Sequence, residues 1–288
     1  MGQRLQSAME YLMTYGWAIL AIAIVMVSLY SLGIFNAGNF KPTATPGSCQ
    51  IIRTAAQTSL AGQCTNMIPK YVANLNGKNS YIPTNALILP NTTTSFSFSV
   101  WVKFASTAAV NQVVLGEVGI LGSQGIFALS ENNGALYLGY AGCGNSNTGT
   151  NTLAPNAWHN IIANWSSSGG VGYIVVDGVR EDVGGTFTLT CGSPSIASFV
   201  IGSTWKAATY FNGSISNVQL YNASLTATDI KSLYREGIGG TPINTQHLVG
   251  WWPLNGDAND YSGYYRNGNA IQVVQNANWQ SGYTVPST

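Results

Sequence analysis

The chain has 288 residues, of which only 7% are charged, and its net charge is +1. An average soluble domain has about 25% charged residues, so uncharged polar side chains and tyrosine must cover most of this surface. The eleven Lys and Arg residues are scattered along the chain, which excludes the clustered basic face that nucleic-acid binding requires. The aromatic content of 11% argues against a disordered chain.

The first predicted element is one long apolar helix. No charged residue occurs from Tyr11 to Phe40, and the apolar core from Trp17 to Phe35 is long enough for a membrane-crossing helix. Apolar side chains would surround this helix, which suits either lipid or a bundle of identical helices. Glu10 stands directly before the run, where a carboxylate is costly unless it is paired or stays among the lipid headgroups. The segment is therefore a cleaved secretory peptide, an uncut anchor or a filament stalk.

Residues 6–11, Gln-Ser-Ala-Met-Glu-Tyr, and the LMTYGWAIL stretch after them resemble the archaeal class III signal peptide of type IV pilin-like proteins. The resemblance implies that residues 1–5 are a leader cut before Gln6 and that residues 6–36 form a transmembrane or stalk helix. It also implies that Glu10 pairs with the free N-terminus of a neighbouring identical subunit. Leu5 departs from the small residue that usually precedes the cut. An uncut leader would leave a membrane anchor, and both readings place the rest of the chain outside the cell, at the membrane or cell surface.

Residues 37–70 are predicted to be a linker followed by a neck that a disulfide closes. The alternative for residues 47–70 is an early strand of the outer domain. The four cysteines form no CxxC motif and lie away from both histidines, which argues against a zinc site. We favour the pairs Cys49–Cys64 and Cys143–Cys191, because the partners in each pair are near in sequence and flanked by Gly or Ser. A bridge that closes a loop of about 15 residues contributes about 3 kcal/mol in the chain-entropy model. Four reduced thiols are the alternative.

From Tyr71 onward, short alternating or β-branched runs recur between turns rich in Gly, Asn and Ser. This pattern predicts an all-β fold with two sheets, a sandwich or jelly roll. The runs are residues 95–104, 112–118, 135–140, 159–165, 171–178, 186–190, 198–203 and 214–222. Residues 224–237 predict a helix, with Ser224 as its N-cap and Gly237 as its stop.

Four of these pieces, taken in order and spacing, resemble the LamG-like, concanavalin A-like jelly roll. They are FSFSVWVK (96–103), WHN (158–160), YIVVDG (173–178) and YFNGSISNVQLY (210–221). The resemblance implies that residues 71–247 form such a jelly roll.

One motif of this family occurs in an unexpected place. Its opening W-x-L-x-G…D-x-SG motif is found near the C-terminus here, as WPLNG (252–256) and DYSG (260–263). Either a truncated second copy begins there or the domain is circularly permuted. Because about forty residues cannot bury a core alone, we expect residues 248–288 to supply strands that complete the sandwich.

The acidic residues predict no enzyme. Glycoside hydrolysis needs two carboxylates that face one sugar bond, and the E-x-D-x-x-E motif of glucanases with this fold is absent from the sequence. Glu181 and Asp182 are adjacent, so on a strand they would face opposite ways. The sequence also contains no G-x-S-x-G, HExxH or phosphate-loop motif.

Two groups of residues are candidates for binding. Asp257, Asn259 and Asp260 are the densest oxygen cluster, and calcium, which takes six to eight oxygen ligands, is the candidate cofactor; the alternative is that Asp260 pins a turn. Aromatic residues in loop regions are candidates for stacking on sugar rings, with plugging of the sandwich ends as the alternative. These aromatic residues are Trp205, Tyr210, Tyr264 and Tyr265.

We therefore expect a non-enzymatic cell-surface protein that displays a jelly roll for adhesion. Its expected partners are the membrane, identical subunits through the N-terminal helix, and glycans or surface proteins, but not nucleic acid. The alternative is a carbohydrate-active or sensory surface protein that is membrane-anchored and not assembled into filaments.

Overall fold

The computed structural model describes residues 2–31, 42–55, 57–65, 67–84, 95–107, 111–119, 125–132, 134–139, 146–148, 153–166, 171–181, 196–203 and 209–286. The chain divides into two compact units, Met1–Lys41 and Pro42–Thr288.

The first unit is the helix α1 (Gly2–Ser31). Most of its large apolar side chains that are described are exposed, with Trp17 at 70% and Ile22 at 63%. Gln6 and Glu10 lie on this helix, but their side chains are outside the described part of the structure. Within the described residues, no helix combines the length and apolar character needed to cross a membrane.

The second unit is a mostly β sandwich, as the sequence predicts, and its larger sheet has eight strands. Seven of them follow the order β14 (Val179–Glu181), β13 (Val171–Val176), β12 (Trp158–Ser166), β7 (Ser95–Phe104), β16 (Asn212–Tyr221), β5 (Val72–Asn76) and β18 (Val274–Asn276). The eighth, β17 (Leu248–Trp252), also pairs with β16. Every pairing in this sheet is antiparallel.

The smaller sheet lies across the core from the larger one and is also antiparallel. Its order is β11 (Ser146–Thr148), β10 (Ala135–Gly139), β9 (Gly125–Asn132), β8 (Gln112–Gly119), β15 (Ile196–Ile201) and β6 (Ile82–Pro83). Alternate residues of β7, such as Phe98 and Val100, pack against Leu115 and Phe199 of this sheet in the main core. The period of two thus places these residues on the core face of β7, while the other face of this strand is also buried.

The sequence predicted seven of these strands to within a few residues. The run at 95–104 coincides with β7, and those near β8, β10, β12, β13, β15 and β16 differ from them only at their ends. The predicted strand at residues 186–190 lies outside the described residues. Strand β9 was not predicted.

Strand β16 changes its neighbour part-way along one edge. Residues 212–215 pair with β5, whereas residues 218–221 pair with β17. Asn217 lies at the change with a φ of 50°, inside a bulge where two residues of β16 lie opposite one residue of β7. The extra residue keeps both Ile215 and Val218 on the core side.

The helix α2 (Ala227–Glu236) covers part of the outer face of the larger sheet. Its N-cap is Thr226, so the prediction of Ser224 was wrong. Thr226 accepts a hydrogen bond from the Asp229 backbone, and the Asp229 carboxylate accepts one in return from the Thr226 backbone. Ser224 would have Ala227 at the corresponding position, which offers no such return bond. Gly237 ends the helix as predicted, with a φ of 79°.

The C-terminal tail covers another part of the same face. Trp279 is fully buried with Trp101 and Trp158 of strands β7 and β12. Its indole N–H donates to the Pro69 carbonyl at 3.1 Å, and its own carbonyl accepts from the Trp158 indole at 2.9 Å. The tail therefore ties the sheet to the segment that precedes β5.

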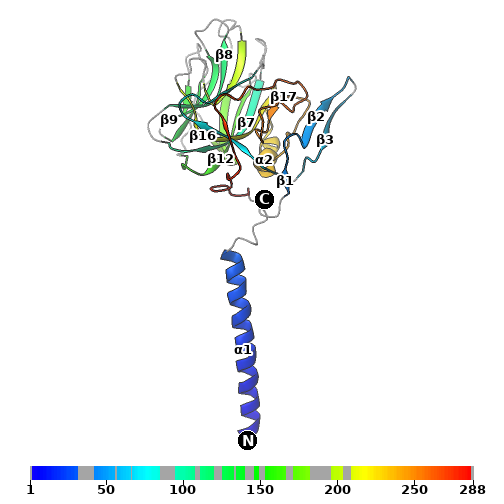
Figure 1. The fold of residues 1–288 in the computed structure, drawn as a ribbon, viewed down its shortest axis with the longest axis vertical. Helices are drawn as coiled ribbons and strands as arrows, with labels where there is room; N and C mark the ends of the chain where they lie inside the picture. Colours follow the sequence, from blue (N-terminus) through cyan, green and yellow to red (C-terminus); the bar gives the residue numbers. More distant parts are fainter. Residues whose placement is uncertain are drawn as a thin grey trace. The chain divides into compact units, whose positions relative to one another are not determined.

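Residues 42–69 pack on the sandwich instead of forming a separate neck. The short strands β1 (Thr43–Ala44) and β4 (Ile68–Pro69) pair in parallel, and β2 (Cys49–Arg53) and β3 (Thr58–Gly62) form a hairpin. Figure 1 shows this hairpin at the margin of the sandwich, close to β17. Ile51 buries its side chain beside Trp251 and Leu248.

The substitution Trp279→Ala should lower the free energy of unfolding by about 3–5 kcal/mol, because it removes a fully buried aromatic side chain and leaves a cavity. Urea denaturation of the full chain measures the change. The exposed neighbour Gln280 supplies the control, since Gln280→Ala should change stability by no more than about 0.5 kcal/mol. Equal stability of the two variants would contradict the anchoring role of the tail.

Candidate functional site

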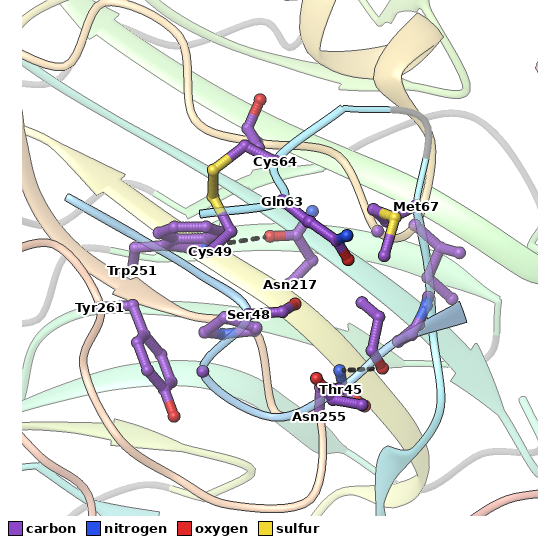
Figure 2. A pocket seen from close by; sticks show the side chains of 17 residues that line it. Thr45, Ser48, Cys49, Gln63, Cys64, Met67, Asn217, Trp251, Asn255 and Tyr261 are labelled. Carbon is purple, nitrogen blue, oxygen red and sulfur yellow. Dashed lines mark hydrogen bonds between the residues drawn. A yellow bond between two sulfur atoms is a disulfide. The ribbon is translucent and has the colours of Figure 1, made fainter. Parts of the chain in front are cut away.

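A cleft opens between the β2–β3 hairpin and the end of the larger sheet where β16 changes partner. The empty space at this cleft is about 490 Å³, a volume that includes open solvent. Its lining comes from five places: the segment 44–49, the stretch 63–69, Asn217 of β16, the loop after α2, and the chain from β17 to Tyr261. Figure 2 shows the side chains that line it, with Trp251 beside the Cys49–Cys64 disulfide.

Asn217 organises the floor of the cleft. It is buried, and its side-chain oxygen accepts from the Trp251 indole at 2.9 Å while its amide donates to the Gly240 carbonyl at 2.8 Å. Asn255 links two other segments at the cleft. Its side-chain oxygen accepts from the Tyr71 backbone N–H, and its amide donates to the Ala44 carbonyl. Both amides are thus fixed by the protein, which makes this part of the cleft rigid.

The disulfide Cys49–Cys64 also lines the cleft and confirms that predicted pair. It joins the first residue of β2 to a residue just beyond β3, with their Cα atoms 5.0 Å apart. Gly62 is required beside it, because a Cβ there would approach the Ser48 carbonyl oxygen to 2.0 Å. The second predicted pair, Cys143 and Cys191, lies outside the described residues.

Several polar groups of the cleft are free for a ligand. Within the described structure, the side chains of Thr45, Ser48 and Gln63 make no hydrogen bond to the protein, and Thr45 and Gln63 are exposed. None of the 17 lining residues carries a charged side chain. Burial, reinforced by the Asp257 carboxylate, raises the pKa of the Tyr261 phenol to about 12. The cleft therefore stays neutral at physiological pH.

The candidate metal ligands bond to their own loop. The Asp260 carboxylate accepts from the backbone N–H groups of Trp251, Ser262 and Arg266. Asp257 accepts from the Tyr261 hydroxyl and from Asn259. Across the described residues, no group of three or more His, Cys, Asp or Glu side chains is placed to hold a metal ion. Calcium binding thus stays a prediction without a preformed site in this part of the structure.

The candidate aromatic residues do not form one group. Trp205 lies outside the described residues, and Tyr210 contacts Tyr81, with ring centroids 6.0 Å apart. Tyr264 and Tyr265 lie together on the loop that follows Tyr261, and they are 44% and 81% exposed. Only these two are near the cleft in sequence.

His159 forms an ion pair away from the cleft. Its Nδ1 lies 2.7 Å from the Asp177 carboxylate, and its Nε2 lies 3.2 Å from the Ala154 carbonyl. Asp177 and Gly178, both with positive φ, form the turn between β13 and β14. Burial lowers the pKa of the His159 ring, but Asp177 and the Ala154 carbonyl together raise it above the ordinary value of 6.5. The pair joins this turn to β12 and has a structural role.

Sequence reasoning missed the residues that build the cleft: Ser48, Gln63, Asn217 and Asn255. The one available signal was the spacing of Ile215, Val218 and Leu220. Under strict alternation Asn217 would share the core face of Ile215, so this spacing predicts a bulge at Asn217.

Comparison with known proteins places residues 76–231, more than half of the chain, in a family described as the concanavalin A-like lectin/glucanases superfamily. No curated protein sequence matches significantly. Among solved structures, a Bacteroides ovatus protein assigned provisionally as carbohydrate-binding is 13% identical with a TM-score of 0.53, over 88% of this chain and 84% of its own.

Two further solved structures match this chain with lower TM-scores. The heptameric SAP-like pentraxin from Limulus polyphemus is 15% identical, with a TM-score of 0.49, over 71% of this chain and 94% of its own. The Trypanosoma rangeli sialidase in complex with the inhibitor DANA is 20% identical with a TM-score of 0.43, and the match covers 52% of this chain but only 24% of the sialidase. At these identities the similarity concerns fold and not activity.

The pair His159–Asp177 should make stability depend on pH. Because the folded-state pKa of His159 is raised, the pair stabilises fully below pH 6.5 and loses this contribution as the pH rises through the folded pKa. The substitution His159→Gln should therefore reduce the free energy of unfolding more at pH 5 than at pH 8, by about 0.5–1 kcal/mol for a partly exposed pair. Thermal unfolding at both values measures this, and Asp177→Asn should behave alike. A loss that is independent of pH would contradict the assignment.

Removal of the disulfide should open the hairpin that walls the cleft. For the double variant Cys49→Ser, Cys64→Ser we expect the local opening free energy of β2–β3 to fall by about 3 kcal/mol, the value for a loop of this length. Hydrogen exchange at the backbone amides of Ile51 and Gln63 should then accelerate, while amides of β7 in the main core keep their protection. Unchanged exchange in the hairpin would show that its packing alone holds it.

Proposed function

Because the chain belongs to the concanavalin A-like lectin/glucanases superfamily, we propose that it is a non-enzymatic carbohydrate-binding protein that takes a neutral sugar unit in the cleft. The observation that carries this proposal is the composition of the cleft. An aromatic floor and wall, Trp251 and Tyr261, stand beside hydroxyl and amide groups that have no protein partner, and no lining residue is charged.

A sugar unit suits these surroundings because it presents hydroxyl groups around its edge and C–H groups on its faces. Binding sites for such ligands combine apolar or aromatic walls with a few fixed polar groups. Ser48 and Gln63 offer both donors and acceptors, and Gln63 is labelled at the cleft in Figure 2. The rigid amides of Asn217 and Asn255 hold the walls, so that little ordering is needed when a ligand binds.

The same composition argues for binding without hydrolysis. A glycosidase needs an acid and a base or nucleophile on opposite sides of the scissile bond, and the lining of the cleft supplies neither. Asp257 and Asp260, the nearest carboxylates in sequence, accept hydrogen bonds from their own loop. Glu131 is fully buried, and its carboxylate accepts from Gln112 and the Gly134 backbone at the opposite sheet.

We propose further that the N-terminal helix keeps this domain at the cell surface. Most of the described apolar side chains of α1 are exposed, such as Ile19 at 65% and Val27 at 68%. An apolar surface of this kind calls for lipid or for copies of the same helix. If copies of the same helix cover this surface, Glu10 pairs with the N-terminus of a neighbouring subunit. The Cys49–Cys64 disulfide supports an oxidising location outside the cell.

The substitution Gln63→Ala should weaken binding of a neutral glycan several-fold, because it removes hydrogen bonds worth about 1 kcal/mol or more. The full chain in detergent micelles can be screened on a glycan array, and the affinity for the best ligand measured by calorimetry. Gln57, on the same hairpin but outside the cleft lining, gives the matched control Gln57→Ala, which should bind as the unaltered chain does. Identical affinity of both variants would reject the cleft as the binding site.

A further inference from the structure

Two arginines share one tyrosine ring at the margin of the cleft. The guanidinium carbons of Arg53 and Arg266 lie 4.3 Å and 4.6 Å from the centroid of the Tyr264 ring. Arg53 is the last residue of β2, whose first residue, Cys49, lines the cleft. The loop that carries Tyr264 and Arg266 begins at Tyr261, another lining residue. The stack is therefore next to the cleft along both chain segments.

Neither guanidinium forms an ion pair. Arg53 donates to the carbonyls of Ser262, Thr245 and Leu248, and Arg266 donates to that of Val249. In the portion of the chain that the structure describes, the ion pair found is that of His159 with Asp177. Asp260 is the carboxylate that acts on Arg266, but its oxygens accept from three backbone N–H groups. Two positive charges thus meet with neutral hydrogen-bond acceptors only.

The two arginines differ in which of their guanidinium N–H groups have no hydrogen-bond acceptor. Arg53 ties the hairpin to the sandwich through Nε and Nη2, and its Nη1 donates to Thr58 within the hairpin. Arg266 donates through Nη1 alone, so its Nε and Nη2 hydrogens find no acceptor within the described residues. Burial lowers the pKa of Arg266, and the neighbouring Arg53 charge lowers it further, against the opposing effects of Asp260 and Tyr264. An anion on the free edge of Arg266 would relieve both of these costs.

Tyr265 has a conformation that the fold itself does not explain. Its φ is 57°, in the left-handed region, and its side chain is 81% exposed. A bulky residue in that region is strained by about 1 kcal/mol or more, and such strain is concentrated at functional sites. An exposed ring recovers nothing through packing, and glycine or asparagine would suit the turn better. The ring instead offers an exposed flat surface one residue before Arg266 in the chain.

We propose that Arg266, Tyr264 and Tyr265 form a binding site for an acidic saccharide, one that carries a carboxylate or a sulfate group. The inference rests on the proposed function and extends it from a neutral sugar in the cleft to a charged unit beside it. The planar fork of Arg266 matches the oxygens of either anion. The Tyr265 ring stacks on the apolar face of the sugar, and the Arg53 charge adds attraction without a direct contact.

Calorimetry on the full chain in detergent micelles tests the site, with oligogalacturonates, heparin oligosaccharides and neutral dextran oligosaccharides as probes. We expect one of the two acidic probes to bind at least tenfold more tightly than the neutral one, and the preferred probe to identify carboxylate or sulfate. Arg266→Gln should weaken that binding about tenfold or more. Arg235→Gln, at an exposed residue of α2, removes the same charge and should leave binding unchanged.

Tyr265→Gly separates binding from folding. The variant should melt at the same temperature as the unaltered chain or higher, because glycine relieves the left-handed strain, and yet it should lose most of the acidic binding. The inference is overturned if Arg266→Gln binds acidic probes as Arg235→Gln does, or if acidic and neutral probes bind alike. If the acidic site fails these tests but Gln63→Ala still weakens binding of a neutral glycan, the proposed function of the cleft remains supported. Absence of binding to every saccharide would reject both.

Discussion

The bulge at Asn217 is the constraint on which the rest of the domain depends. A continuous ladder would give β16 one partner along this edge, but the extra residue ends the pairing with β5 and lets β17 pair with the remainder. The Asn217 amide then holds the new neighbour through the Trp251 indole and the loop after α2 through the Gly240 carbonyl. One polar residue, buried and fully hydrogen-bonded, thus positions the strand, the loop and the floor of the cleft.

The C-terminal segment decides which surface remains for a ligand. Strands β17 and β18 extend the larger sheet, and Trp279 with Tyr283 covers Trp101 on its outer face, next to α2. The outer face of the central strands is therefore buried beneath aromatic side chains. What stays open lies at the margin, where the disulfide hairpin meets β17 and where exposed tyrosines and unpaired arginines gather.

The sequence predicted the elements better than the site. The alternation of Phe96, Phe98 and Val100 identifies β7, because one face of a strand must be buried and the period is local. Cys49 and Cys64 could be paired because they are close in the chain. The cleft, in contrast, joins Gln63, Asn217 and Asn255 from distant segments, and nothing in their local sequence shows that they meet. The pairing of Arg53 with Tyr264 and Arg266 depends on the hairpin packing against a loop some 200 residues later, which only the tertiary fold determines.

A crystal structure of the full chain with the saccharide that it binds most tightly is the most direct test of this account. A sugar unit should occupy the cleft, within hydrogen-bonding distance of Ser48 and Gln63 and next to the Tyr261 ring. Any acidic group of the ligand should lie on the free edge of Arg266. A saccharide bound elsewhere, with the cleft empty and the two arginines without a contact, would contradict the account.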